Sequence, residues 1–268
     1  MFRKVMLVFL ALVFCAFVVA GIDLVRHAMA GRRLENAGVR LRDWHYRFSG
    51  KAAAVSYGYD DLQSWRGRWR RMIAVPRQAS LFSRQPAVLP MMVDRKVLRD
   101  LALLGIEEVE MYDCRGLTPD VMSELSRNGS LRVLIVARCD VTNEGLNLLW
   151  PGCPNLQAVQ IVRNGIGDEA FRDVKAARAL KVFGLWYLDI SQQTIAYLAE
   201  APSVERLALG DLRVGEEWGP PLAAMRQLRR VQLQDVTAGG VILQRLRVLR
   251  PDIMVTLDSG ESGRERME

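Results

Sequence analysis

The chain has 268 residues, of which 50% are hydrophobic and 25% are charged, and this composition excludes a disordered or collagen-like protein. Its length suits one large domain or two small ones. The formal net charge is +7, but residues 1–80 carry 14 Lys and Arg against 5 Asp and Glu, so the basic excess lies in the N-terminal third. This distribution argues against nucleic acid as a partner, and we expect none.

An uncharged apolar run of 18 residues, Val5–Ile22, follows Arg3 and Lys4 near the N-terminus. As a helix it just spans a hydrocarbon core of about 30 Å. We therefore predict a transmembrane anchor within residues 1–25. The alternative is a signal peptide that is cleaved after Ala20, which would leave a secreted protein.

Five arginines follow the apolar run within about twenty residues, and they bear on the orientation of a single-pass protein: Arg26, Arg32, Arg33, Arg40 and Arg42. The positive-inside rule then favours a cytoplasmic C-terminal domain. Long domains cross membranes largely regardless of flanking charge, so the opposite side stays open.

Residues 26–93 form a basic, Arg- and Trp-rich linker. Within it, Trp65 and Trp69 are four residues apart, as are Arg66 and Arg70, so a helix would carry an aromatic stripe beside a basic one. One interpretation is a helix on the membrane surface, with arginines at anionic headgroups. We favour the other, an N-terminal cap that packs on the repeats described next, because stacked repeats need a cover at their open end.

A repeat occupies residues 94–257. Its six copies open at Ile106, Leu131, Leu156, Leu180, Val204 and Leu228, at intervals of 24 or 25 residues. Position +3 holds Val109, Leu134, Val159, Phe183, Leu207 and Val231, and position +5 holds Met111, Val136, Ile161, Leu185, Leu209 and Leu233. A seventh strand is expected at Val255 and Leu257. Fixed periods of this length are typical of solenoids, in which each repeat buries its apolar face against its neighbours.

The segments LRVLIVARCDVTNEGLNLL (131–149) and LQAVQIVRNGIGDEAF (156–171) resemble the leucine-rich repeat pattern LxxLxLxx(N/C)xL, and GCPNL (152–156) resembles the link between cysteine-containing repeats. The layout of anchor, basic linker and repeats is similar to bacterial membrane-anchored proteins with short repeats of this kind. The resemblance implies an α/β solenoid with a curved parallel sheet inside and short helices outside. For function it implies only the binding of a protein or ligand.

Position +8 is polar in the family, where its side chain bonds buried backbone in the turn after the strand. Cys114, Cys139 and Asn164 suit that role, whereas the later copies have Leu188, Leu212 and Val236. We therefore expect the later turns to be built differently. Pro220 and Pro221 should also interrupt the outer helix of the fifth copy.

The outward positions of the strands, at +2, +4 and +6, would line the concave face. The predicted binding residues there are Tyr112, Val133, Ile135, Val162, Val182, Trp186, Arg206 and Arg230. An exposed apolar patch with a charged rim is typical of an interface, and a tryptophan often anchors one. We predict a protein or peptide partner centred on Trp186, unless the linker or the tail covers the face. The alternative function is a structural, self-associating envelope protein without a discrete ligand.

No catalytic motif is present, so we expect no enzyme. Neither the four cysteines nor the two histidines have the spacing of a zinc site, and we predict no metal, cofactor or disulfide framework. Residues 258–268 are polar and rich in small residues, which predicts a disordered tail.

Overall fold

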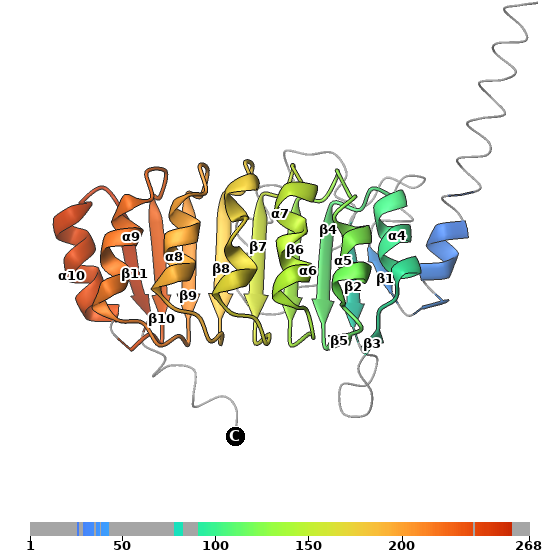
Figure 1. Ribbon diagram of the computed structural model, residues 1–268, viewed down its shortest axis with the longest axis horizontal. Coiled ribbons are helices and arrows are strands. Elements are labelled where there is room, and N and C mark those ends of the chain that lie inside the picture. Colours follow the sequence, from blue (N-terminus) through green and yellow to red (C-terminus); the bar gives the residue numbers. More distant parts are fainter. Residues whose placement is uncertain are drawn as a thin grey trace, which may run out of the picture.

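The computed structural model describes residues 26, 29–34, 36, 37, 39–42, 78–82, 91–237 and 239–258. In this part of the chain nine strands form one sheet in the order β1-β2-β4-β6-β7-β8-β9-β10-β11. Figure 1 shows the strands side by side, with the helices covering one face of the sheet. The strands are β1 (Arg40–Arg42), β2 (Gln78–Phe82), β4 (Glu108–Tyr112), β6 (Val133–Ala137), β7 (Ala158–Val162), β8 (Val182–Trp186), β9 (Arg206–Gly210), β10 (Arg230–Gln234) and β11 (Met254–Asp258).

The outer layer consists of short helices, one or two for each strand. The α-helices are α4 (Arg95–Leu103), α5 (Pro119–Leu125), α6 (Asn143–Asn147), α7 (Leu149–Gly152), α8 (Gln192–Ala199), α9 (Gly219–Ala224) and α10 (Gly239–Leu249). The 3-10 helices are η1 (Asp168–Phe171), η2 (Val174–Ala176) and η3 (Glu216–Trp218). Pro220 and Pro221 lie in the first turn of α9, where a proline is tolerated, so they begin a helix and do not break one.

The register of the sheet follows the repeat. Glu108 pairs with Val133, Val133 with Ala158, and the same column continues through Val182, Arg206 and Arg230 to Met254. All these pairs are parallel, as a repeat with one crossover per strand requires. The predicted leucine-rich repeat architecture is confirmed by this register.

The sheet also extends to the N-terminal side of the first copy. β2 pairs in parallel with β4, and β1 pairs antiparallel to β2. A second, two-stranded sheet joins β3 (Met91–Met92) to β5 (Cys114–Arg115), just after the end of β4. Strands from the linker therefore continue the sheet of the repeats.

The core lies between the sheet and the helices. The +3 and +5 side chains of all six copies are at most 2% exposed. The helical side of the core follows the predicted +15 position up to Ile195 and then shifts by one residue. Trp218 fills the place expected for Gly219, and Ile242 that expected for Leu243. Each shift puts a larger or better-placed apolar side chain into the core.

A short helix closes the N-terminal end of the stack. Residues 29–34 are helical, and Ala30 and Leu34 are buried in the common core. Arg33 Nε and Nη2 each donate to the Asp100 carboxylate of α4 at 2.7 Å. Asp100 is 2% exposed, and a buried carboxylate is costly unless it is paired. The two hydrogen bonds from Arg33 supply that pairing.

The turn after each strand has the same backbone in all six copies. Position +7 is left-handed in every one, with φ between 49° and 54°, although none of these residues is glycine: Asp113, Arg138, Arg163, Tyr187, Asp211 and Asp235. The expectation of a different later turn is therefore wrong for this backbone position. The difference lies in the hydrogen bonds.

In the early copies the +8 side chains bond the turn. Asn164 Oδ1 accepts from Cys139 N at 2.9 Å, and Asn164 Nδ2 donates to Val136 O and Val162 O. Other side chains link the loops of adjacent copies along the stack, as Asp140 does by accepting from Gly116 N and Leu117 N. Asp168 accepts from Ser191 N and Oγ and from Thr194 Oγ1.

Several predicted features lie outside the described residues: the apolar run Val5–Ile22, the membrane-surface candidates Trp65, Arg66, Trp69 and Arg70, and residues 259–268 of the predicted tail. The first tail residue, Asp258, is ordered as the last residue of β11, contrary to the prediction. No helix in the described part of the chain has the length and apolarity needed to cross a membrane.

Candidate binding surface

All eight predicted binding residues lie on strands β4 and β6 to β10, on the face opposite the core. The register places Tyr112, Val162 and Trp186 in one row across the sheet. Val133, Val182, Arg206 and Arg230 form a second row, four residues nearer the start of the strands. Ile135 lies between the two rows. The fold thus gathers residues that span 118 positions of sequence on one surface.

This surface is less exposed than an open apolar patch would be. Ile135 is 6% exposed, so it supports the surface from below and offers little area to a partner. Val133, Val162, Val182 and Trp186 are half-buried, and Arg230 is exposed. The accessible centre is therefore narrower than predicted and is concentrated around β8.

Trp186 lies flat on the sheet. A Cβ at Gly184, two residues earlier in β8, would overlap the benzene ring of the indole. A Cβ at Gly210, the partner of Trp186 on β9, would overlap its pyrrole ring. The indole thus spans both glycines, with one ring face against the backbone. Glycine in a strand interior weakens the strand and marks close approach, and here the approaching group is the indole.

The position of Trp186 leaves its polar atom available. The indole N–H donates no hydrogen bond to any residue that the structure describes. Ala208 follows Gly184 in the same row on β9, so the floor beside the ring is built from small side chains. A flat apolar ring with a free donor at its edge can stack on a partner group and fix its orientation.

One rim of this surface is formed by the left-handed residues at +7. Arg138 Nε and Nη2 bond both oxygens of Asp113 at 2.8 and 2.7 Å, and this pairing lowers the pKa of Asp113. The Arg163 guanidinium lies 4.1 Å from the ring centre of Tyr187. Hydrogen bonding to the neighbouring Asp211 carboxylate raises the pKa of Tyr187. These side chains are thus held in place beside Trp186.

The sequence predicted a charged rim for this surface, but not that the residues at +7 have a left-handed backbone. Several of these side chains contact their counterpart in the adjacent copy, as Arg138 does with Asp113 and Arg163 with Tyr187. A charged or aromatic residue recurs directly after each strand in the sequence, and this recurrence could have pointed to the rim.

The other side of the surface carries cations. Arg206 on β9 and Arg230 on β10 are direct neighbours, and neither makes an ion pair with a described residue. The adjacent Lys181, by contrast, lies 3.9 Å from Glu205. Two unpaired arginines beside a half-buried apolar centre favour a partner that brings a carboxylate or another anion.

Three of the four cysteines lie in the described part of the chain. Cys114, Cys139 and Cys153 are free thiols and buried. Hydrogen bonding with Cys139, together with burial, raises the pKa of the Cys114 thiol, and burial raises the pKa of the Cys153 thiol to about 12. In the opposite direction, hydrogen bonding with Cys114 lowers the pKa of the Cys139 thiol, although burial opposes this. Cys114 and Cys153 are therefore poor nucleophiles, because a buried thiol that stays protonated reacts slowly. Among the described residues no group of three His, Cys, Asp or Glu is placed to hold a metal ion.

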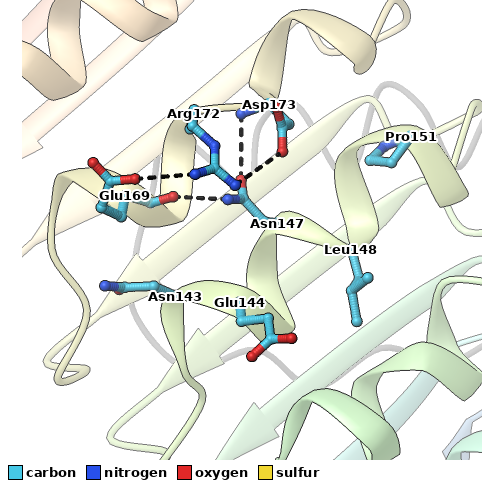
Figure 2. Close-up of a pocket in the computed structure, with 8 residues that line it drawn as sticks. All are labelled: Asn143, Glu144, Asn147, Leu148, Pro151, Glu169, Arg172 and Asp173. Carbon is cyan, nitrogen blue, oxygen red and sulfur yellow. Dashed lines mark hydrogen bonds and ion pairs between the residues drawn. The ribbon is translucent and has the colours of Figure 1, made fainter.

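A shallow depression of about 350 Å³ lies on the helical side, between α6 and η1 (Figure 2). Its polar side chains bond one another. Asn147 donates to Glu169 O and accepts from Asp173 N, while Arg172 pairs with both acidic side chains. The bonds of Asn147 join two adjacent copies, while the Arg172 pairs lie within one copy, so the depression marks the contact between neighbouring repeats.

Two comparisons with known sequences found nothing: no family model matches the chain, and no curated protein matches it. Among solved structures it is similar to internalin C2 of Listeria monocytogenes, at 15% identity and a TM-score of 0.44, over 67% of this chain and 80% of that one. It is also similar to a leucine-rich repeat protein of Leptospira interrogans, at 16% identity and a TM-score of 0.38, over 58% of this chain and 38% of that one. The fold assignment therefore rests on the repeat register described above.

Proposed function

We propose that this chain is a membrane-tethered interaction module without enzymatic activity, and that its concave face binds a protein or peptide around Trp186. The observation that carries the proposal is the indole lying flat across Gly184 and Gly210. Two glycines inside adjacent strands weaken the sheet, and a fold under selection for stability alone would fill these positions.

The surroundings of the ring indicate the chemistry of the partner. Arg206 and Arg230 supply positive charge on one side, and the rim of Arg163, Tyr187 and Asp211 lies on the other. A peptide with a flat apolar or aromatic side chain next to an acidic one would match this order. Stacking on a fixed indole has a small entropic cost, which is why tryptophan dominates many interfaces.

The tether is proposed from the sequence and from the N-terminal helix. Val5–Ile22 is apolar enough to enter a bilayer, and the helical residues 29–34 follow it closely in the sequence. The ion pair of Arg33 with Asp100 fixes that helix to the stack. An anchor so connected would hold the repeats close to the membrane surface.

Site-specific photo-crosslinking in living cells tests the binding face. A benzoylphenylalanine at Gln160, on the concave side of β7, should give a discrete adduct, and the same probe at Gln193, on α8, should not. Both positions are accessible, so they form a matched pair. Adding Trp186→Arg to the Gln160 variant should remove the adduct while the chain stays folded. An adduct that survives Trp186→Arg would refute the concave-face site.

Protease protection in intact spheroplasts tests the tether separately. A C-terminal tag is read on the same blot as the size of the chain. A membrane-bound chain of full length supports the anchor, and loss or protection of the tag gives its orientation. A shortened chain in the soluble fraction would contradict the tether and favour a cleaved signal peptide.

A further inference from the structure

A basic surface lies at the N-terminal end of the stack. It consists of four exposed cations, two on α4 and two in or just before the helix at residues 29–34, and we call it the basic end: Arg26, Arg32, Lys96 and Arg99. None of the four makes an ion pair with a described residue. Arg33 joins the two helices through Asp100, and Figure 1 shows the blue helix of residues 29–34 beside α4. The four cations therefore share one end of the molecule.

Each of these helices also exposes one large apolar side chain beside its cations. In α4, Lys96, Arg99 and Leu103 are spaced i, i+3 and i+7, so they lie on one side of the helix, and Leu103 is 46% exposed. In the N-terminal segment, Met29 follows Arg26 by three residues and is 56% exposed. Cations that flank exposed apolar side chains are typical of a surface that meets the headgroup region of a bilayer.

Cations in the middle of the helical side, by contrast, are paired. Arg127, Arg172 and Lys175 each lie within 3.5 Å of a glutamate. Arg95, which lies on the side of α4 towards α5, likewise pairs with two carboxylates of α5. The basic end therefore lacks the counter-charges that the neighbouring repeats supply to one another.

The long undescribed segments of the chain do not supply these counter-charges either. Residues 1–25 carry two Lys and Arg against one Asp, residues 43–77 carry seven against three, and residues 83–90 carry one against none. Each of these segments has the same sign of charge as the basic end, and like charges repel. Residues 259–268 follow β11, which is at the other end of the sheet order. The charge balance therefore favours an anionic partner from outside the chain.

We propose that the basic end docks on an anionic lipid surface, where the phosphate groups of the lipids provide the counter-charge. This inference rests on the tether proposed above and adds which part of the stack the membrane contacts. Arg26 follows Ile22, the last residue of the apolar run, by four residues, so an anchored chain keeps Arg26 within about 14 Å of the hydrocarbon core. That span is comparable with the Debye length of about 8–10 Å, so an anionic leaflet attracts cations held there.

This contact sets the orientation of the binding surface. Lys96 and Arg99 lie on α4, on the helical side of the sheet, whereas Trp186 lies on the opposite, concave face. Docking through the basic end therefore turns Trp186 away from the lipid and leaves it open to a partner. A tether alone would hold the repeats near the membrane without selecting which face they present.

Fluorescence quenching in vesicles tests the contact. The full chain carries Cys15→Ser, and its other three cysteines are buried, so one added cysteine can be labelled with bimane. Leu103→Cys places the label at the basic end, and Val248→Cys places it on α10 at the other end; both positions are exposed. The vesicles are made of phosphatidylcholine alone or of phosphatidylcholine and phosphatidylglycerol in a ratio of roughly 2:1. A fraction of the lipids in both carries a nitroxide quencher on the headgroup.

The expected result is quenching that depends on both lipid charge and label position. At residue 103 it should be at least about twofold stronger in the anionic vesicles than in the neutral ones, because the basic end is then held at the headgroups. At residue 248 it should be the same in both. The label at residue 103 lies more than seventy residues after the apolar run, so the tether alone does not force it to the lipid.

Charge reversal gives a matched pair of variants. Lys96→Glu with Arg99→Glu should remove the gain in quenching at residue 103. Arg226→Glu with Arg247→Glu makes the same change in net charge at two exposed positions near α9 and α10, neither of which pairs with a described residue, and it should keep the gain. All four substituted side chains are exposed, so both variants should fold as the parent does.

The outcomes separate the contact from the tether. Equal quenching at residue 103 in both kinds of vesicle, equal quenching at residues 103 and 248, or a gain that survives the reversal of Lys96 and Arg99 would each overturn the proposed contact. A chain that floats with the vesicles but shows no gain would refute the contact and leave the tether intact. A chain that does not float with either kind of vesicle would refute the tether and, with it, the contact.

Discussion

The flat position of Trp186 can be tested by adding a single methyl group beneath it. Gly210→Ala places a Cβ where the pyrrole ring of the indole now lies, so the ring must leave the sheet. The substitution retains the tryptophan and changes only the backbone position on which its ring rests. Gly184→Ala makes the same test under the benzene ring.

Two opposing effects set the magnitude. Alanine in a strand interior is more stable than glycine by about 0.5–1 kcal/mol, because glycine loses more backbone freedom on folding. Against this, lifting one face of the indole exposes roughly 100 Å² of apolar area, about half of what a tryptophan buries. At about 25 cal/mol per Å² this costs about 2.5 kcal/mol. We therefore expect Gly210→Ala to lower the free energy of unfolding by about 1.5–2 kcal/mol.

The assay is a double-mutant cycle with Trp186→Ala, measured by urea unfolding with far-ultraviolet circular dichroism. Without the indole, Gly210→Ala should become stabilising by about 0.5–1 kcal/mol, so its sign should reverse. The coupling energy between the two positions should be about 2.5 kcal/mol. If Gly210→Ala has the same effect in both backgrounds, the indole does not rest on Gly210 and the reasoning fails.

Three further predictions concern the turns and the loops between copies. Asn164→Leu removes three hydrogen bonds, two of them buried and one partly buried, and should cost about 2–4 kcal/mol in urea unfolding. Asn155→Leu removes one exposed hydrogen bond and should cost under about 1 kcal/mol; equal costs would contradict the role assigned to Asn164. For Asp168, partial burial opposes ionisation, but hydrogen bonds from Thr194 and Ser191 lower its pKa below the ordinary value of 3.8. Its stabilising effect is then full above that value and is lost as the pH falls through the lower native pKa, so the stability gap to Asp168→Asn should shrink between about pH 5 and about pH 2. Asp211→Gly should be more stable than Asp211→Ala by about 1 kcal/mol in thermal unfolding, because both lose the carboxylate and only glycine adopts a positive φ without cost; a reversed order would refute strain at this position.

The predicted fold could be read from the sequence because the information is local and repeated. Val109 and Met111 recur in six copies at the same offset, and strand alternation alone sends both side chains to one face. The turn role of Asn164 was predicted from the resemblance to the leucine-rich repeat pattern, and its hydrogen bonds confirm it. The helical side was read less well, since Trp218 and Ile242 displaced the expected Gly219 and Leu243 by one position.

The repeat spacing by itself determined the parallel register, the buried columns and the row of residues on the concave face, because a fixed period forces equivalent positions into line. Tertiary structure decided the rest. It laid Trp186 over Gly184 and Gly210, which are neighbours only because β8 and β9 pair, and it buried Ile135 within a face predicted to be open. It also gave different exposures to Leu233 and Leu257, which occupy the same position in adjacent strands: the first is buried and the second is exposed. Burial depends on what packs next to a residue, and only the packed stack shows that nothing described follows β11.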